Sequence, residues 1–144
     1  MYYDEYVKQL REAIDASYEA LDYLYAAQDY LHSARNWGIF DIFGGGIIAT
    51  LIKRRKMDKA RHYMDDARDS LLRLKSELLD VDEMTDLHLN MDDFVSFSDY
   101  FFDGFLFSDI MVQNRINDAR SKLNDTIECI EDIRDELKVR LNDL

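Results

Sequence analysis

Residues 37–56, WGIFDIFGGGIIATLIKRRK, form the stretch in which the chain departs from a charged, periodic pattern. An aromatic and aliphatic run leads into three glycines, a second apolar run follows, and four consecutive bases end the stretch. It separates two long amphipathic segments and is the best candidate for an interaction or membrane-contact site. The candidate residues are Trp37, Phe40, Phe43, Gly44, Gly45, Gly46, Lys53, Arg54, Arg55 and Lys56.

Before this stretch, residues 3–35 place apolar or small side chains in alternating steps of four and three. This spacing is the period of a coiled-coil seam, so we expect one long helix that ends near Asn36. The seam consists of Tyr3, Val7, Leu10, Ile14, Ser17, Leu21, Leu24, Gln28 and Leu31. A second column, at a spacing of seven, consists of Ala13, Ala20, Ala27 and Ala34. Alanine in such a column lets another helix approach closely.

Tyrosines flank this seam, because Tyr18 and Tyr25, and likewise Tyr23 and Tyr30, repeat at seven residues. Their rings combine an apolar body with a hydrogen-bonding tip. Two interpretations stay open: the tyrosines border the protein's own core, which we favour, or they form a partner surface. The alanine and tyrosine columns together motivate the prediction of a homodimer.

After the glycines, a second helix is predicted to run to about Leu79 or Asp80. Its seam is Met57, Ala60, Met64, Ala67, Leu71, Leu74 and Leu78. Residues 81–107 interrupt the pattern and contain an aromatic cluster, Phe94–Phe107, and Ser108 then resembles a helix N-cap. The last helix, to the C-terminus, carries Ile116, Ala119, Leu123, Ile127, Ile130, Ile133, Leu137 and Leu141.

The two parts of the chain after the first helix resemble each other at an offset of 59 residues, with Gly45 matching Gly104. Ala60-Arg61 likewise matches Ala119-Arg120. We therefore predict an internal two-copy repeat, each copy consisting of a short aromatic segment, a glycine and a long helix.

Composition favours the same architecture. The chain has 144 residues, no proline and five glycines, so few positions can break a helix. We predict one domain, residues 1–144: an all-α, elongated bundle of three long amphipathic helices with two short aromatic helical segments. The net charge of −12 argues against a nucleic-acid partner. The single cysteine, Cys129, and the lack of a signal-peptide pattern favour a cytoplasmic location.

No motif for catalysis, a cofactor or a metal is recognised in the sequence. The three glycines lack the lysine of a phosphate-binding loop, and no strand precedes them. Asp58, His62 and Asp66 share a helix face, but a surface ion cluster is favoured over a metal site. We therefore predict that the protein is not an enzyme and needs no cofactor or metal.

The apolar run before the basic residues is too short to span a membrane, and Asp41 interrupts it. Docking at a membrane surface is an alternative, with Trp37 at the headgroup level and Lys53–Lys56 facing anionic lipid. The favoured interpretation is a short segment packed in the core, followed by a solvated basic turn.

The pattern Trp37-Gly38, Asp41, Gly44–Gly46, Lys53 and Met57-Asp58, with a later segment from Phe101 to Gln113, resembles an uncharacterised family of bacterial helical proteins. The resemblance covers about half of the chain. It implies an all-helical fold and a bacterial, cytosolic origin, and it brings no activity or binding residues.

The sequence thus predicts a non-enzymatic interaction or scaffold protein that binds a protein partner, or itself, through helix faces. The alternative is a peripheral membrane-binding protein that uses Trp37–Lys56. A further alternative is a small-ligand-binding protein or enzyme with a pocket at Phe94–Phe107.

Overall fold

The computed structural model of the chain describes residues 2–40, 46–82 and 113–144. These residues form three long helices: α1 (Tyr2–Phe40), α2 (Gly46–Asp82) and α4 (Gln113–Asn142). No strand occurs in the described ranges. The prediction of an all-α bundle of three long helices is therefore confirmed.

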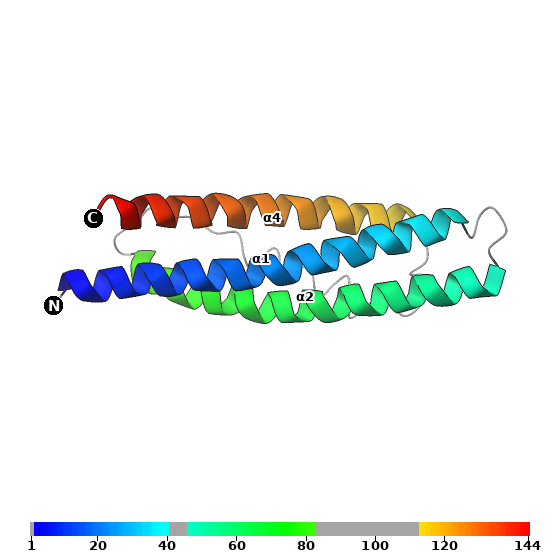
Figure 1. Ribbon diagram of the computed structural model, residues 1–144, viewed down its shortest axis with the longest axis horizontal. Helices are drawn as coiled ribbons and strands as arrows, with labels where there is room; N and C mark the ends of the chain where they lie inside the picture. Colours follow the sequence, from blue (N-terminus) through cyan, green and yellow to red (C-terminus); the bar gives the residue numbers. More distant parts are fainter. Residues whose placement is uncertain (1, 41–45, 83–112) are drawn as a thin grey trace.

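The three helices lie side by side in an elongated bundle (Figure 1). Later residues of α1 contact earlier residues of α2, because Glu19 bonds to Ser70 whereas Tyr30 stacks on Tyr63. The same holds for α4, since Tyr18 bonds to Lys138 whereas Tyr25 bonds to Glu131. Both α2 and α4 are thus antiparallel to α1 and parallel to each other. At 39 residues, α1 is about 58 Å long.

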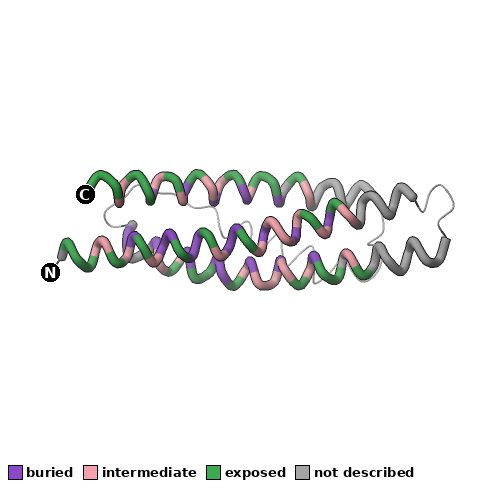
Figure 2. Tube along the Cα trace, viewed as in Figure 1, coloured by how far each residue is buried: buried purple, intermediate pink, exposed green. Residues whose placement is uncertain are grey.

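The core follows one side of each helix, as the buried residues in Figure 2 show. Most seam residues predicted from the sequence are buried. On α1 the buried apolar residues are Leu10, Ala13, Ile14, Ala16, Ala20, Leu21, Leu24, Ala27 and Leu31. On α2 they are Ala60, Met64, Ala67, Leu71, Leu74, Leu78 and Val81, and on α4 they are Leu123, Ile127, Ile130, Ile133 and Leu137.

Helix α1 packs more closely against α2 than against α4. Alanines explain the difference, because Ala20 and Ala27 of α1 and Ala60 and Ala67 of α2 are completely buried. Small side chains let two helix backbones approach each other. The residues of α4 described as buried are leucine and isoleucine, which are larger than alanine.

Two helix ends differ from the prediction. α1 continues past Asn36 to Phe40, so Trp37–Phe40 extend the helix instead of belonging to a separate segment. Gly38 is the only helix breaker there, and one glycine costs a helix about 1 kcal/mol, which does not end it. α2 reaches Asp82 instead of ending at Leu79 or Asp80, and this extension buries Val81.

Other predictions fall outside the described residues. These include the aromatic cluster Phe94–Phe107 with its proposed pocket, the N-cap at Ser108, and Gly104 of the predicted repeat. The repeat stays a prediction. Its two long helices, α2 and α4, do run in the same direction along α1.

Candidate interaction surfaces

The candidate residues predicted from the sequence lie at one end of the bundle. Trp37 and Phe40 belong to the last turns of α1, and Gly46 is the first residue of α2. The four bases Lys53–Lys56 follow about two turns into α2. Phe43, Gly44 and Gly45 lie outside the described residues. The fold therefore brings together, at the bundle end, the two helical parts of a stretch that was continuous only in sequence.

An aromatic stack joins α1 and α2 near this end of the bundle. The rings of Tyr30 on α1 and Tyr63 on α2 are stacked, with centroids 5.5 Å apart and planes at 14°. The ammonium of Lys56 lies 5.4 Å from the centroid of the Tyr30 ring, a cation–π distance. Lys56 is half-buried, whereas its neighbour Arg55 is exposed. Lys56 thus has a structural contact, and Arg55 faces solvent.

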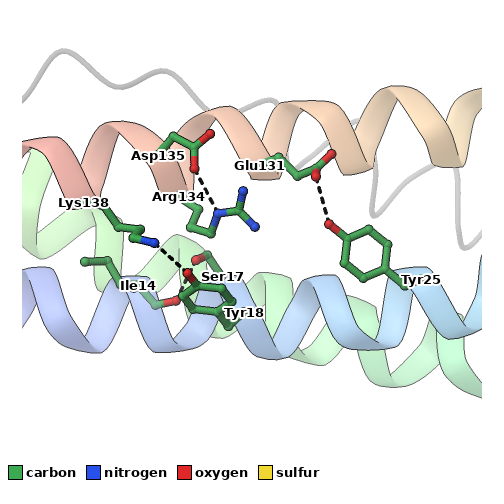
Figure 3. A network of polar contacts seen from close by, with 8 residues as sticks. All are labelled: Ile14, Ser17, Tyr18, Tyr25, Glu131, Arg134, Asp135 and Lys138. Atoms are coloured by element: carbon green, nitrogen blue, oxygen red, sulfur yellow. Dashed lines mark hydrogen bonds and ion pairs between the residues drawn. The ribbon is translucent and has the colours of Figure 1, made fainter.

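Polar side chains line the edge where α1 meets α4 (Figure 3). Nζ of Lys138 donates a hydrogen bond of 2.9 Å to the hydroxyl of Tyr18. The guanidinium of Arg134 lies 5.4 Å from the centroid of the same ring. Arg134 also donates a hydrogen bond of 3.1 Å to Asp135. Two cations of α4 therefore surround one tyrosine of α1.

One heptad along, Tyr25 donates a hydrogen bond of 2.9 Å to Oε2 of Glu131 (Figure 3). Burial raises the pKa of Tyr25 above its ordinary value, and the hydrogen bond and the negative charge of Glu131 raise it further. Desolvation lowers the pKa of Arg134, but the hydrogen bond to Asp135 and its negative charge outweigh that effect and raise the pKa. Tyr25 therefore stays neutral and Arg134 stays charged.

The same edge continues toward the start of α4. Gln28 donates a hydrogen bond to Asn124, and the guanidinium of Arg120 lies 3.1 Å from Nδ1 of His32. Because arginine can only donate, Nδ1 of His32 is the acceptor in this contact. The polar seam residue Gln28 thus contacts α4, and polar seam residues commonly set the register in coiled coils.

Glu19 makes the corresponding polar contact between α1 and α2. Oε1 of Glu19 accepts a hydrogen bond of 3.2 Å from Ser70, and its other oxygen pairs with Arg73. Ser70 is buried, whereas the second polar residue of the core, Ser17, donates a hydrogen bond of 2.6 Å to the carbonyl oxygen of Ile14. Each buried serine hydroxyl therefore has an acceptor.

The alanine and tyrosine columns of α1 serve the protein's own core. Ala13, Ala20 and Ala27 are fully buried, and the side chain of Ala34 is not among those described. Tyr25 and Tyr30 bond or stack across the helix edges. These residues therefore contribute to contacts within the bundle, whereas Tyr18 is 40 % exposed. Self-association itself stays a prediction.

The surface ions predicted on α2 pair within that helix. Nε2 of His62 lies 3.5 Å from Oδ2 of Asp66, one turn away. Within 2–40, 46–82 and 113–144, no three His, Cys, Asp or Glu side chains converge in a way that could hold a metal ion. Cys129, the single cysteine of the chain, is half-buried.

On its solvent-exposed face, α4 carries a row of acidic side chains. The exposed acidic residues are Asp125, Glu128, Asp132 and Asp135. Steps of three and four residues place them on one helix face. The next residue of the row, Val139, is 53 % exposed, an unusual position for an aliphatic side chain. The sequence shows this spacing opposite the predicted seam of the last helix, but the row was not among the candidate residues predicted from the sequence.

Comparisons with known protein families, with curated proteins and with solved structures give no match to this chain. The resemblance to bacterial helical proteins therefore stays a prediction. None of the helices in the described part of the chain combines the length and the apolar composition needed to cross a membrane.

Proposed function

We propose that this protein is a non-enzymatic interaction or scaffold protein, which binds a protein partner or a second copy of itself through an outer helix face. The face that we assign is the acidic row of α4 together with Val139. The observation that carries the proposal is the contrast between the two sides of α4. One side buries leucine and isoleucine, and the other exposes four carboxylates and an aliphatic side chain.

The acidic row weakens α4 as an isolated helix. Glu128 and Asp132 are one turn apart, and like charges at this spacing destabilise a helix. Asp135 of the row pairs with Arg134, so this repulsion concerns Glu128 and Asp132. A partner that brings Lys or Arg to this face would remove the repulsion and cover Val139. Complementary charge of this kind favours fast and specific association.

A second copy offers a suitable surface. Of the three described helices, only α2 has more basic than acidic residues. Lys59 is one of its exposed bases. The net charge of −12 makes nucleic acid an unsuitable partner. The single, half-buried Cys129 fits a reducing compartment, so the proposal includes a cytoplasmic location.

Site-specific photocrosslinking tests the assigned face. A photoreactive amino acid at Glu128 or Asp132 should give a discrete crosslinked product in the producing cell. The matched control is the same amino acid at Asp15 or Asp22, which are exposed on α1. A product of twice the 17.1 kDa mass of the chain would identify a second copy, and any other mass a different protein.

Charge reversal provides an independent measurement. Glu128→Lys with Asp132→Lys should abolish the crosslink from a probe at Asp125, whereas Asp15→Lys with Asp22→Lys should preserve it. Equal crosslinking from α1 and α4, or none from α4, would contradict the proposal.

A further inference from the structure

One end of the bundle combines apolar helix ends with a band of positive charge. We call this the helical tip and define it as residues 33–40 of α1 and 46–57 of α2. It contains no Asp or Glu, although the whole chain has 30 of them. It contains five bases: Arg35, Lys53, Arg54, Arg55 and Lys56. The tip is therefore cationic, in a chain whose net charge is −12.

The two helix ends of the tip project in the same direction, and α2 starts beyond the end of α1 in Figure 1. Tyr30 and Lys56 are in contact across the α1–α2 edge. Tyr30 lies ten residues before the end of α1, and Lys56 lies ten residues after the start of α2. Because the helices are antiparallel, each end projects about 15 Å beyond this contact. Both project past the start of α4 in Figure 1.

The sequence of the tip is layered along the rod. The outermost turns carry Trp37, Ile39 and Phe40 on α1, and Ile47 and Ile48 on α2. The last turn of α1 contains no basic residue and the first turn of α2 contains no acidic one, so neither end carries the charge that usually complements a helix terminus. The basic band begins about 10 Å below the start of α2.

We propose that the helical tip docks end-on onto an anionic phospholipid surface. Apolar segments of interfacial helices enter a membrane by about 5–10 Å, to the boundary between headgroups and acyl chains. At that depth the basic band lies level with the lipid phosphates, and Trp37 lies in the interfacial region that tryptophan prefers. The acidic remainder of the rod is repelled by the same surface and points away from it.

This docking mode is separate from the proposed binding of a partner through α4. The acidic row lies on the outer face of α4, and the tip consists of α1 and α2. A rod held end-on at a membrane would leave the row accessible. Failure of either proposal therefore leaves the other standing.

The native chain carries its own probe, because Trp37 is its only tryptophan. Vesicles of phosphatidylcholine with about one-third phosphatidylserine should bind the protein and shift the Trp37 emission to the blue. Brominated lipids in the same vesicles should quench that emission. Pure phosphatidylcholine should bind much more weakly. No binding to the anionic vesicles, or binding without a change in Trp37 emission, would overturn the proposal.

A pair of charge-matched variants locates the contact. Arg54→Gln with Arg55→Gln removes two tip charges and leaves the Lys56–Tyr30 contact in place. Lys8→Gln with Arg11→Gln removes two exposed charges near the other end of α1. Each basic residue near an anionic surface contributes about a fivefold factor in the binding constant, so the tip variant should bind roughly 25-fold more weakly. Equal weakening of both variants would contradict docking through the tip.

Discussion

Enlarging Ala20 tests whether the alanine column lies inside the bundle. Ala20 is completely buried, on the helix whose closest neighbour is α2. Leucine at this position adds three carbon atoms to a close helix contact. Overpacking of a core typically costs 1–3 kcal/mol, and the close approach of the helices places Ala20→Leu at about 3 kcal/mol. For a chain of this size, that corresponds to a loss of roughly 6–12 °C in Tm.

Ala26→Leu is the matched control, because Ala26 is on the same helix and is only half-buried. Its free energy of unfolding should change by no more than about 0.5 kcal/mol. Both variants are compared by chemical denaturation and thermal unfolding, with the solution mass measured by light scattering. An Ala20→Leu protein with unchanged stability and an altered mass would refute the internal column and restore the dimer surface.

Three further predictions concern individual contacts. Leu74→Ala should lower the free energy of unfolding by about 2–5 kcal/mol in a urea titration, because Leu74 is fully buried. In the same titration, Leu72→Ala should cost less than about 1 kcal/mol, because Leu72 is 46 % exposed. Because the folded-state pKa of Tyr25 is raised, its contribution to stability is complete below the ordinary tyrosine pKa of about 10 and is lost as the pH rises through the folded value. Tyr25→Phe should therefore flatten the loss of stability between about pH 9 and 11. An unchanged profile would refute the contact with Glu131. Tyr30→Leu should cost about 1–2 kcal/mol by removing the ring stack and the cation–π contact, which calorimetry would detect.

Helical periodicity was sufficient to predict most of the core. Leu24, Leu71 and Ile130 were placed correctly because each helix needs one apolar stripe, and that stripe is visible as a spacing of 3.5 residues. Tyr3 was wrong, since it is 54 % exposed near the start of α1. A seam pattern gives no information on where the neighbouring helix ends.

Residues at the sides of the stripe were missed. Ala16 and Ser70 are buried although neither belongs to a predicted seam. α1 contacts two helices, so its buried face is wider than the stripe of a two-stranded coiled coil. The number of neighbours of a helix is a property of the fold, and it does not appear in the period of one segment.

The candidate surfaces were predictable only in part. Residues 37–56 were distinct by composition, but their placement at one end of the bundle follows from the antiparallel packing of α1 and α2, in which Tyr30 contacts Lys56. The polar edge between α1 and α4 had one signal in the sequence. Tyr18 and Tyr25 are seven residues apart, and so are their partners Glu131 and Lys138. Matching such columns between helices requires knowing that the two helices are antiparallel.

The measurement that tests the central arrangement most directly is the distance between spin labels on α2 and α4, by pulsed electron resonance. With Cys129→Ala, labels would be attached at Leu72 and at either Val139 or Ser121, all of which are exposed. Leu72 lies near the level of Glu19, and Val139 lies near the level of Tyr18, whereas Ser121 is about 27 Å farther along α4. Parallel α2 and α4 predict that the Leu72–Val139 distance is shorter than the Leu72–Ser121 distance by on the order of 10 Å. The reverse order would contradict the fold and the functional surfaces derived from it.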